Sequence, residues 1–481
     1  MSNNMETDVV VVGSGAAGLA AAITVAEEGA KVIVCEKQPS VGGTSNFFNG
    51  TFAVESAMQK VGYVAYTRDQ AFRNHMEYNH WRANGPLVRA LINKSADTIE
   101  WLKERGVAFT GVTINMPDAP RTYHLVQGGG EAAVKALVTR AKEKAVSLKL
   151  SSPVKSILKK NKLPAGVVAE IGGEDVEVTC RAVIIASGGY ANNNEWIKKY
   201  AHLDLGVNVF PLGNTGKMGD GIRMAWEMGA GAEGMGVLHM VRVAPFGQEF
   251  PFMNVVEAVA IQPILWVDPH GRRFCDEGIA FYDTSTGNVN ARFEKGYTWC
   301  IFDDGLKDYY TEKGLDRGIA QIYLPGAKLK NLNTELEYML SLNSPELIWA
   351  DSPQALATKM EVDPMVLTAT TEEYNGFCEK GRDNLFGKDP IYLRPLKGPR
   401  YYAARARTCF LGTLGGIRAN EKTEVVDRYD VPIPGLYVGG NDMGGLHAES
   451  YSMRDTSGIA SAFALNSGRI AGENAVSYLK R

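Results

Sequence analysis

Short apolar runs and amphipathic stretches follow one another along the chain, and their order predicts its architecture. Continuous apolar runs without alternation occur at residues 9–12, 31–34 and 182–186. Such runs are typical of parallel strands that are covered on both faces. Apolar positions recur at helical spacing in residues 19–28, 86–105, 131–144, 222–228, 353–376 and 457–479. This succession of strands and helices predicts an α/β protein with a parallel sheet.

The first strand ends in a glycine-rich turn. Gly13 permits the tight turn, Gly15 lets a diphosphate approach the backbone, and Gly18 lets the following helix pack closely on the strand. The N-terminal amides of that helix and its dipole favour bound phosphate. Glu36 ends the second strand roughly 20 residues past the glycines, where an acid accepts hydrogen bonds from a ribose hydroxyl. The segment therefore predicts a dinucleotide site.

The chain changes character twice, which indicates an inserted domain. An alternating pattern over residues 147–178 predicts a small β-meander. Glycine-rich turns of the phosphate-binding kind are absent from residues 235–389, where prolines and aromatic residues become common, and the dinucleotide-fold pattern resumes near Tyr401. We therefore expect a nucleotide-binding domain in two parts, residues 1–234 and 390–481, interrupted by a second domain at residues 235–389.

Composition and charge exclude several classes of protein. The 481 residues carry a net charge of −3, with 22% charged residues, so no field attracts nucleic acid or an anionic membrane. No signal peptide is recognisable, and no apolar stretch approaches the roughly 18 residues of a membrane span. The six cysteines are scattered without a CxxC pair, which disfavours a metal site, attached haem and disulfides. We expect a cytoplasmic protein without a bound metal.

An ordered series of motifs resembles the flavoprotein superfamily of fumarate reductase and succinate dehydrogenase. The motifs lie at residues 13–18, 42–44, 186–189, 219–221, 271–278, 413–416, 435–440 and 467–472. This superfamily includes 3-ketosteroid dehydrogenases and tricarballylate dehydrogenase. The resemblance implies a Rossmann-type, glutathione reductase-like FAD-binding domain with an inserted α+β capping domain. It also implies hydride and proton exchange across a carbon–carbon bond beside a ketone or carboxylate.

The resemblance implies one FAD and assigns residues to it. Some superfamily members attach FAD through a histidine near Thr44, but no histidine lies between Glu36 and Phe72, so we expect non-covalent FAD. The predicted cofactor-binding residues are Gly13, Ser14, Gly15, Ala16, Ala17, Gly18, Glu36, Lys37, Gly42, Gly43, Thr44, Ser45, Gly50, Thr51, Ala186, Ser187, Gly188, Asn214, Gly219, Asp220, Gly440, Asn441, Ser457, Gly458 and Ile459. Asn441 replaces an acid of the superfamily. The dipole of the last helix favours negative charge on the reduced flavin.

Four residues resemble catalytic residues of the superfamily. His447 matches a histidine that binds a substrate carboxylate or carbonyl, and Arg454 lies about three residues beyond the position of a substrate-binding arginine, which would clamp a carboxylate. Tyr451 matches a tyrosine of ketosteroid dehydrogenases that polarises the ketone. Tyr282 lies, within one position, where ketosteroid-type members place a tyrosine, and residues 278–283 lack the proton-delivering arginine that fumarate-reducing members have in this segment. His239 is a further candidate near a histidine at the entrance of the capping domain.

Three functions follow from these matches. The first is an FAD-dependent dehydrogenase or reductase of a carbon–carbon bond beside a ketone or carboxylate, acting on a small molecule bulkier and less charged than fumarate. The second is a fumarate reductase-like enoate reductase in which Arg454 and His447 clamp a carboxylate. The third is a flavoprotein electron-transfer subunit of a partner complex. The sequence identifies neither the electron donor nor the electron acceptor.

Overall fold

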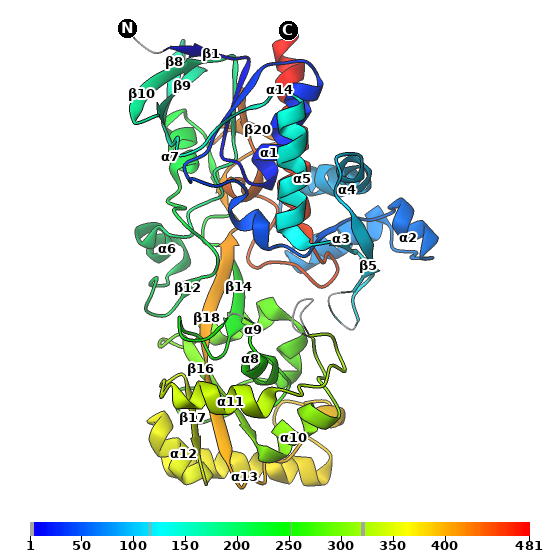
Figure 1. Ribbon diagram of the computed structural model, residues 1–481, viewed down its shortest axis with the longest axis vertical. Helices are drawn as coiled ribbons and strands as arrows, with labels where there is room; N and C mark the ends of the chain where they lie inside the picture. Colours follow the sequence, from blue (N-terminus) through cyan, green and yellow to red (C-terminus); the bar gives the residue numbers. More distant parts are fainter. Residues whose placement is uncertain (1–3, 115, 117, 252, 319–322) are drawn as a thin grey trace. The chain divides into compact units, whose positions relative to one another are not determined.

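The computed structural model describes residues 4–114, 116, 118–251, 253–318 and 323–481 (Figure 1). The chain divides into two compact units. The first unit comprises residues 1–203, 211–239 and 411–481, and the second comprises residues 204–210 and 240–410. The second unit therefore ends about twenty residues later than the expected inserted domain (389 against 410) and also takes in residues 204–210. Its role as a capping domain stays a prediction.

A six-stranded sheet forms the centre of the first unit. Its order is β20 (Glu424–Val426), β21 (Pro432–Val438), β11 (Ala182–Ile185), β2 (Val9–Val12), β3 (Val32–Cys35) and β7 (Ser147–Lys149). All neighbours are parallel except β20 and β21. All residues of β2, β3 and β11 are buried, as expected for strands covered on both faces. The sheet confirms the predicted α/β fold with parallel strands.

Three helices and an antiparallel meander belong to this sheet. The helices α1 (Ala16–Glu27), α5 (Gly129–Glu143) and α14 (Ile459–Leu479) form one core with β2, β3 and β11, and Figure 1 shows them side by side. The meander consists of β8 (Val154–Lys160), β9 (Leu163–Ile171) and β10 (Glu174–Thr179), with β1 (Met5–Glu6) parallel to β10. β9 contacts β11 and β21. The prediction of a meander was wrong only at β7, which joins the parallel sheet instead, beside β3.

Shorter elements complete the first unit. A three-stranded sheet joins β4 (Gly50–Phe52), β6 (Tyr123–Val126) and β5 (Phe109–Thr113), and β13 (Ala232–Glu233) pairs with β19 (Gly416–Ile417). The remaining helices are α2 (Ala57–Val61), α3 (Arg68–Tyr78), α4 (Gly85–Glu104), α6 (Asn194–Ala201), α7 (Asp220–Glu227) and the 3₁₀ turns η1 (Gly43–Phe47) and η4 (Gly440–Asp442). The helix expected at 457–479 begins two residues later because Gly458 adopts a left-handed conformation.

The second unit has its own sheet and its own core. Its strands are β15 (Leu265–Val267), β16 (Tyr297–Asp303), β17 (Leu347–Ala350) and the parts up to residue 210, from residue 240 and up to residue 410 of β12 (Phe210–Pro211), β14 (Leu238–Val243) and β18 (Tyr401–Thr413). Its helices are α8 (Val255–Ala260), α9 (Asp283–Ala291), α10 (Asp304–Glu312), α11 (Leu332–Ser341), α12 (Pro353–Met360), α13 (Pro364–Lys380) and the 3₁₀ turns η2 (Glu277–Phe281) and η3 (Pro390–Tyr392). The long strand β18 pairs antiparallel with β16 and β17. Buried residues of these strands, α8 and the later helices form the core.

The single helix expected at residues 353–376 is two helices. Glu361 adopts a left-handed conformation at the end of α12, and the Asp363 side chain accepts the Met365 amide at the start of α13. Pro364 occupies the first position of α13, where a proline needs no backbone donor. The apolar spacing continued across the break, so periodicity alone did not reveal it.

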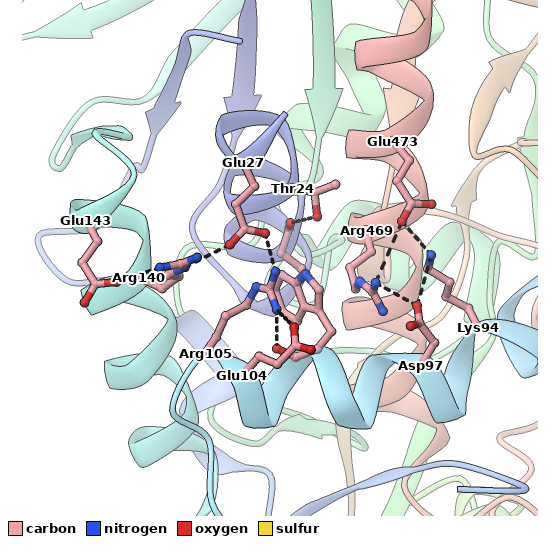
Figure 2. A network of polar contacts seen from close by, with 12 residues as sticks. Thr24, Glu27, Lys94, Asp97, Glu104, Arg105, Arg140, Glu143, Arg469 and Glu473 are labelled. Atoms are coloured by element: carbon pink, nitrogen blue, oxygen red, sulfur yellow. Dashed lines mark hydrogen bonds and ion pairs between the residues drawn. The ribbon is translucent and has the colours of Figure 1, made fainter. Parts of the chain in front are cut away.

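Charged side chains join the helices of the first unit (Figure 2). Glu27 of α1 accepts from Arg105, which follows α4, and from Arg140 of α5 at 2.9 Å. Arg469 of α14 donates to Asp97 of α4 at 2.9 Å, and Lys94 of α4 donates to Glu473 of α14 at 2.6 Å. Each ion pair joins two helices that lie far apart in the sequence.

Replacing Arg105 by methionine should destabilise this part of the fold. Arg105 is 10% exposed and its partner Glu27 17%, while the guanidinium also lies 4.2 Å from the centre of the Trp101 ring. We expect a loss of about 2 kcal/mol in the free energy of unfolding, measured with urea. Lys480→Ala is the matched control, because Lys480 and Glu28 are 66% and 54% exposed. Equal losses in both variants would contradict a specific contribution of the buried pair.

Among the described residues, no helix has the length and apolar character that crossing a membrane requires.

Candidate functional site

The turn between β2 and α1 lies at the carboxyl ends of the parallel strands. Ser14 donates to Glu36 Oε2 from its amide at 2.8 Å and from its hydroxyl at 2.6 Å. The Gln38 amide donates to Glu36 Oε1 at 2.8 Å. The Glu36 carboxylate therefore faces the start of α1, at the edge of the sheet where nucleotides bind in folds of this kind. Here Ala16 at the helix N-terminus donates to Ser45 Oγ at 2.9 Å.

Glycine is present at two positions of this turn for different structural reasons. A β-carbon at Gly18 would lie 2.0 Å from the Gly13 carbonyl oxygen, so α1 can follow the turn this closely only with glycine there. A β-carbon at Gly15 would meet nothing nearer than Ser45 Oγ at 3.6 Å. The open space at Gly15 faces the α1 N-terminus, so the backbone there is accessible to a ligand.

The segment from Gly42 to Ser45 runs beside the same edge. The Gly42 amide donates to the Ser14 carbonyl at 3.1 Å, which holds this segment against the β2–α1 turn. Thr44 Oγ1 accepts a hydrogen bond of 2.8 Å from Lys217 Nζ. Lys37 donates to Asp220 at 2.9 Å and to the Gly216 carbonyl at 3.0 Å, so the residue 214–221 loop also closes on this edge. The helix α7 begins at Asp220, within this segment.

The end of β11 is organised by a buried acid that the sequence motifs did not single out. Asp442 of η4 accepts the amides of Ser187, of Gly188 at 3.0 Å and of Gly189 at 2.9 Å. The Asp442 side chain is fully buried, and burial raises its pKa. The sequence did contain a signal for this residue, because Asp442 directly follows Asn441, at whose position the superfamily has an acid. The carboxylate thus occupies the β11 amides to which we had assigned a cofactor role.

Two of the predicted cofactor residues carry buried polar atoms that have no partner among the described residues. These atoms are Thr51 Oγ1 on β4 and Asn214 Oδ1. Buried polar atoms of this kind are rare in folded proteins and point to a missing group. The N-terminus of α14 is nearby, because the Phe52 amide of β4 donates to the Gly458 carbonyl at 3.0 Å. The donors, acceptors and open backbone of the first unit therefore fit a bound dinucleotide.

A row of aromatic side chains lies beside α14. The rings of His239 and Tyr451 are stacked with their centres 3.7 Å apart, and His447 lies 5.1 Å from Tyr451. The Ala460 amide in the first turn of α14 donates to the Tyr451 hydroxyl at 3.2 Å. On the other side of His447, the ring of His75 lies 5.2 Å away. The structure therefore brings together three residues predicted from the sequence and adds His75, for which the sequence offered no signal.

His447 is a neutral hydrogen-bond donor. Its Nδ1 accepts from the Ser452 amide at 3.4 Å, a bond that assigns the proton to Nε2. Burial, with His75 and His239 close by, lowers the pKa of His447 well below its usual value. The Nε2 atom is buried and has no partner in the described part of the chain. His447 also lines a pocket of about 250 Å³ together with Glu233, Met235 and Gly445. The imidazole can thus donate to an oxygen atom of a ligand.

Arg454 and Tyr282 each have their own surroundings. Arg454 is 51% exposed and forms an ion pair of 2.8 Å with Asp118. Tyr282 belongs to the second unit, where its amide donates to the Ile279 carbonyl at 2.8 Å and its backbone begins α9. The carboxylate clamp of the second candidate function would require Arg454 to exchange Asp118 for the substrate. The roles of both residues stay predictions.

The segment before Tyr282 is held by buried charges. Arg273 donates to Glu277 at 2.7 and 2.9 Å and to Asp383 at 2.9 Å. Lys388 lies 3.4 Å from Glu277, and all these side chains are buried. Such a network is stable only when each charge is paired. It gives η2, and with it the backbone that leads to Tyr282, a fixed conformation within the second unit.

Together, the parallel sheet and the phosphate-type turn with Glu36 define a dinucleotide-binding protein, which also has a buried hydrogen-bond donor beside α14. Comparison with known proteins agrees with this class. The family described as an FAD binding domain matches residues 8–450. Vinyl phenol reductase of Lactiplantibacillus plantarum is 32% identical over 480 residues, which cover 98% of this chain and 96% of that protein.

Two further comparisons support the same assignment. A fumarate reductase (cytochrome) of Shewanella frigidimarina is 29% identical over 486 residues, which cover 98% of this chain and 78% of that protein. The solved structure of 3-ketosteroid delta1-dehydrogenase from Sterolibacterium denitrificans shares the fold, with a TM-score of 0.79 at 19% identity, covering 98% and 99% of the two chains.

The chain belongs to the FAD-binding family, within the fumarate reductase and succinate dehydrogenase flavoprotein superfamily. FAD is its cofactor, and it is an oxidoreductase that acts on a carbon–carbon bond. These findings confirm the family, the cofactor and the reaction class expected from the sequence.

Proposed function

We propose that the protein reduces a carbon–carbon double bond conjugated to the oxygen atom of a neutral, flat substrate, such as a vinyl phenol. The observation that carries this proposal is the orphaned Nε2–H donor of a neutral His447. A neutral donor binds a phenol, enone or ketone oxygen without the desolvation cost of a second buried charge. The relative of highest identity reported above, a vinyl phenol reductase, supports this substrate class.

The residues have separate roles in this reaction. His447 binds the conjugated oxygen and draws electron density away from the double bond, and Tyr451 with His239 provides a flat aromatic surface against which a planar substrate stacks. Tyr282 carries the proton of the reacting carbon. Bound FAD in its reduced state would supply the hydride for one carbon of the double bond, and the proton goes to the other. The closed surroundings of His447 keep water from competing for its Nε2–H.

Non-covalent FAD is held at the strand edge of the first unit. The α1 amides, the Gly15 backbone and Ser45 bind the diphosphate, and Glu36 binds the ribose. Thr51 and Asn214 supply their buried unpaired oxygens. The dipole of α14 stabilises negative charge on the reduced ring. The other cofactor residues named in the sequence analysis complete this site, apart from the Ser187 and Gly188 amides, which Asp442 occupies.

Anaerobic mixing tests the substrate. The enzyme is reduced with dithionite and mixed with 4-vinylphenol, styrene, an unsaturated ketosteroid or fumarate, while the flavin absorbance is recorded. We expect 4-vinylphenol to reoxidise the flavin fastest, and styrene, which lacks the oxygen, to react slowest. Faster reoxidation by fumarate would overturn the proposal and favour an enoate reductase in which Arg454 turns from Asp118 to the substrate.

An electron-transfer subunit would give a different result in the same experiment. None of these compounds would reoxidise its flavin, and it would copurify with a redox partner. For the enzyme proposed here, the electron donor is an unidentified reductant that the dithionite replaces.

The state of the cysteines favours a reducing compartment of the cell. All six are free thiols, as expected in a reducing compartment. We therefore place the protein in the cytoplasm.

A further inference from the structure

A buried lysine lies at the strand edge where the nucleotide binds. Lys217, in the loop before α7, is 9% exposed and lies against the end of β11. A β-carbon added to Gly188 would be 3.2 Å from Lys217 Cε and 3.4 Å from its Nζ. Its ammonium donates to Thr44 Oγ1 at 2.8 Å. Lysine is almost never buried without a charged partner, so this position needs an explanation.

The two nearby carboxylates do not explain why Lys217 is buried. Glu36 and Asp442 act on Lys217 electrostatically, but their oxygens accept backbone amides, from Ser14 and Gln38 and from residues 187–189. Among the described residues, Thr44 is the hydrogen-bond acceptor of the ammonium, which has three N–H groups. Two donors of a buried cation thus stay available.

The charge and the position of Lys217 favour the binding of an anion beside it. Burial lowers its pKa to about 8, with Asp442 and Glu36 opposing the shift, so the side chain is a cation at neutral pH. The other lysine of this edge, Lys37, is about 41% exposed and is paired with Asp220. Two carboxylates already lie here, so a diphosphate requires additional positive charge beyond the α1 dipole.

We propose that Lys217 binds the FAD diphosphate, donating from Nζ to a phosphate oxygen while Thr44 holds the side chain in place. In this role the lysine is a cofactor-binding residue from the loop before α7, beside Thr44 and the end of β11. The α1 amides and Lys217 then share the charge of one diphosphate.

Titration of the FAD-free protein with FAD tests this proposal directly. In Lys217→Gln we expect the dissociation constant of FAD to rise about 10- to 100-fold, the cost of losing a hydrogen bond from a charged donor. The affinity for riboflavin, which has no phosphate, should change little. Lys217→Arg retains the charge and should lose less affinity than Lys217→Gln. Binding is followed by the flavin fluorescence, without any substrate.

The matched control is Lys155→Gln, which removes a lysine that pairs with Asp175 on the meander of the same unit. This variant should bind FAD as the unchanged protein does. Raising the salt concentration should weaken FAD binding more in the unchanged protein than in Lys217→Gln. Unchanged FAD affinity in Lys217→Gln, or an equal loss for FAD and riboflavin, would overturn the proposal. If Lys217→Gln fails to fold, Lys217→Arg is the deciding variant, and equal losses of affinity for FAD and riboflavin in it would overturn the proposal.

Discussion

Replacing Tyr282 by phenylalanine should lower kcat by about 100- to 10,000-fold, the range that general acid–base groups contribute. The change removes only the hydroxyl that we propose carries the proton. The backbone at Tyr282 begins α9 and is held by the Ile279 carbonyl, so the fold should persist. FAD content and KM should stay close to those of the unchanged protein. Stopped-flow reoxidation of the reduced flavin by 4-vinylphenol measures the effect.

Tyr392→Phe is the control for this prediction. Tyr392 belongs to the same unit, and its ring lies 5.4 Å from that of Phe281, the residue before Tyr282. Its hydroxyl has no role in the proposed chemistry, so its variant should react at the normal rate. A normal kcat for Tyr282→Phe would show that another group, such as Tyr451, carries the proton.

Replacing Gly15 by alanine should weaken FAD binding by about 100-fold or more, because the methyl group occupies the space through which the diphosphate reaches the α1 amides. Gly15 has an extended conformation that alanine readily adopts, with φ of −68° and ψ of −179°. Its β-carbon would meet no atom closer than 3.6 Å. The FAD-free variant should therefore fold normally, and fluorescence titration with FAD measures the loss.

Gly376→Ala provides the comparison for a methyl group in an open position. Gly376 lies in α13 of the second unit, and no atom lies within 4 Å of its added β-carbon. This variant should bind FAD normally and be slightly more stable, because alanine favours helices over glycine by about 1 kcal/mol. Normal FAD affinity in Gly15→Ala would mean that the diphosphate does not approach this turn.

Local pattern was sufficient for the first unit because its signals come from neighbouring residues. The four valines of β2, the glycines after them and Glu36 after β3 lie within one strand–helix–strand segment, so their spacing fixes their geometry. The short strand β7 was assigned to the meander instead of the parallel sheet, because side chains alternate with the same two-residue period in the strands of both sheets. Its place beside β3 depends on pairing across more than a hundred residues.

The candidate catalytic residues were harder to judge from the sequence. The resemblance to the superfamily identified His447, Tyr451 and His239, and the fold brings their rings together. Spacing did not predict that His447 is neutral, since that state results from burial beside His75. The motif match also gave no indication that Arg454 pairs with Asp118.

The sequence by itself determined the parallel sheet, the FAD cofactor and the class of reaction, because each depends on short motifs with fixed spacing. Only the tertiary structure decided which charges are buried at the cofactor edge. Lys217 and Thr44 are separated by 173 positions, and nothing in either segment alone indicates their hydrogen bond. Burial and electrostatic neighbours arise from contacts between distant segments, and these lower the pKa values of Lys217 and His447 and raise the pKa of Asp442.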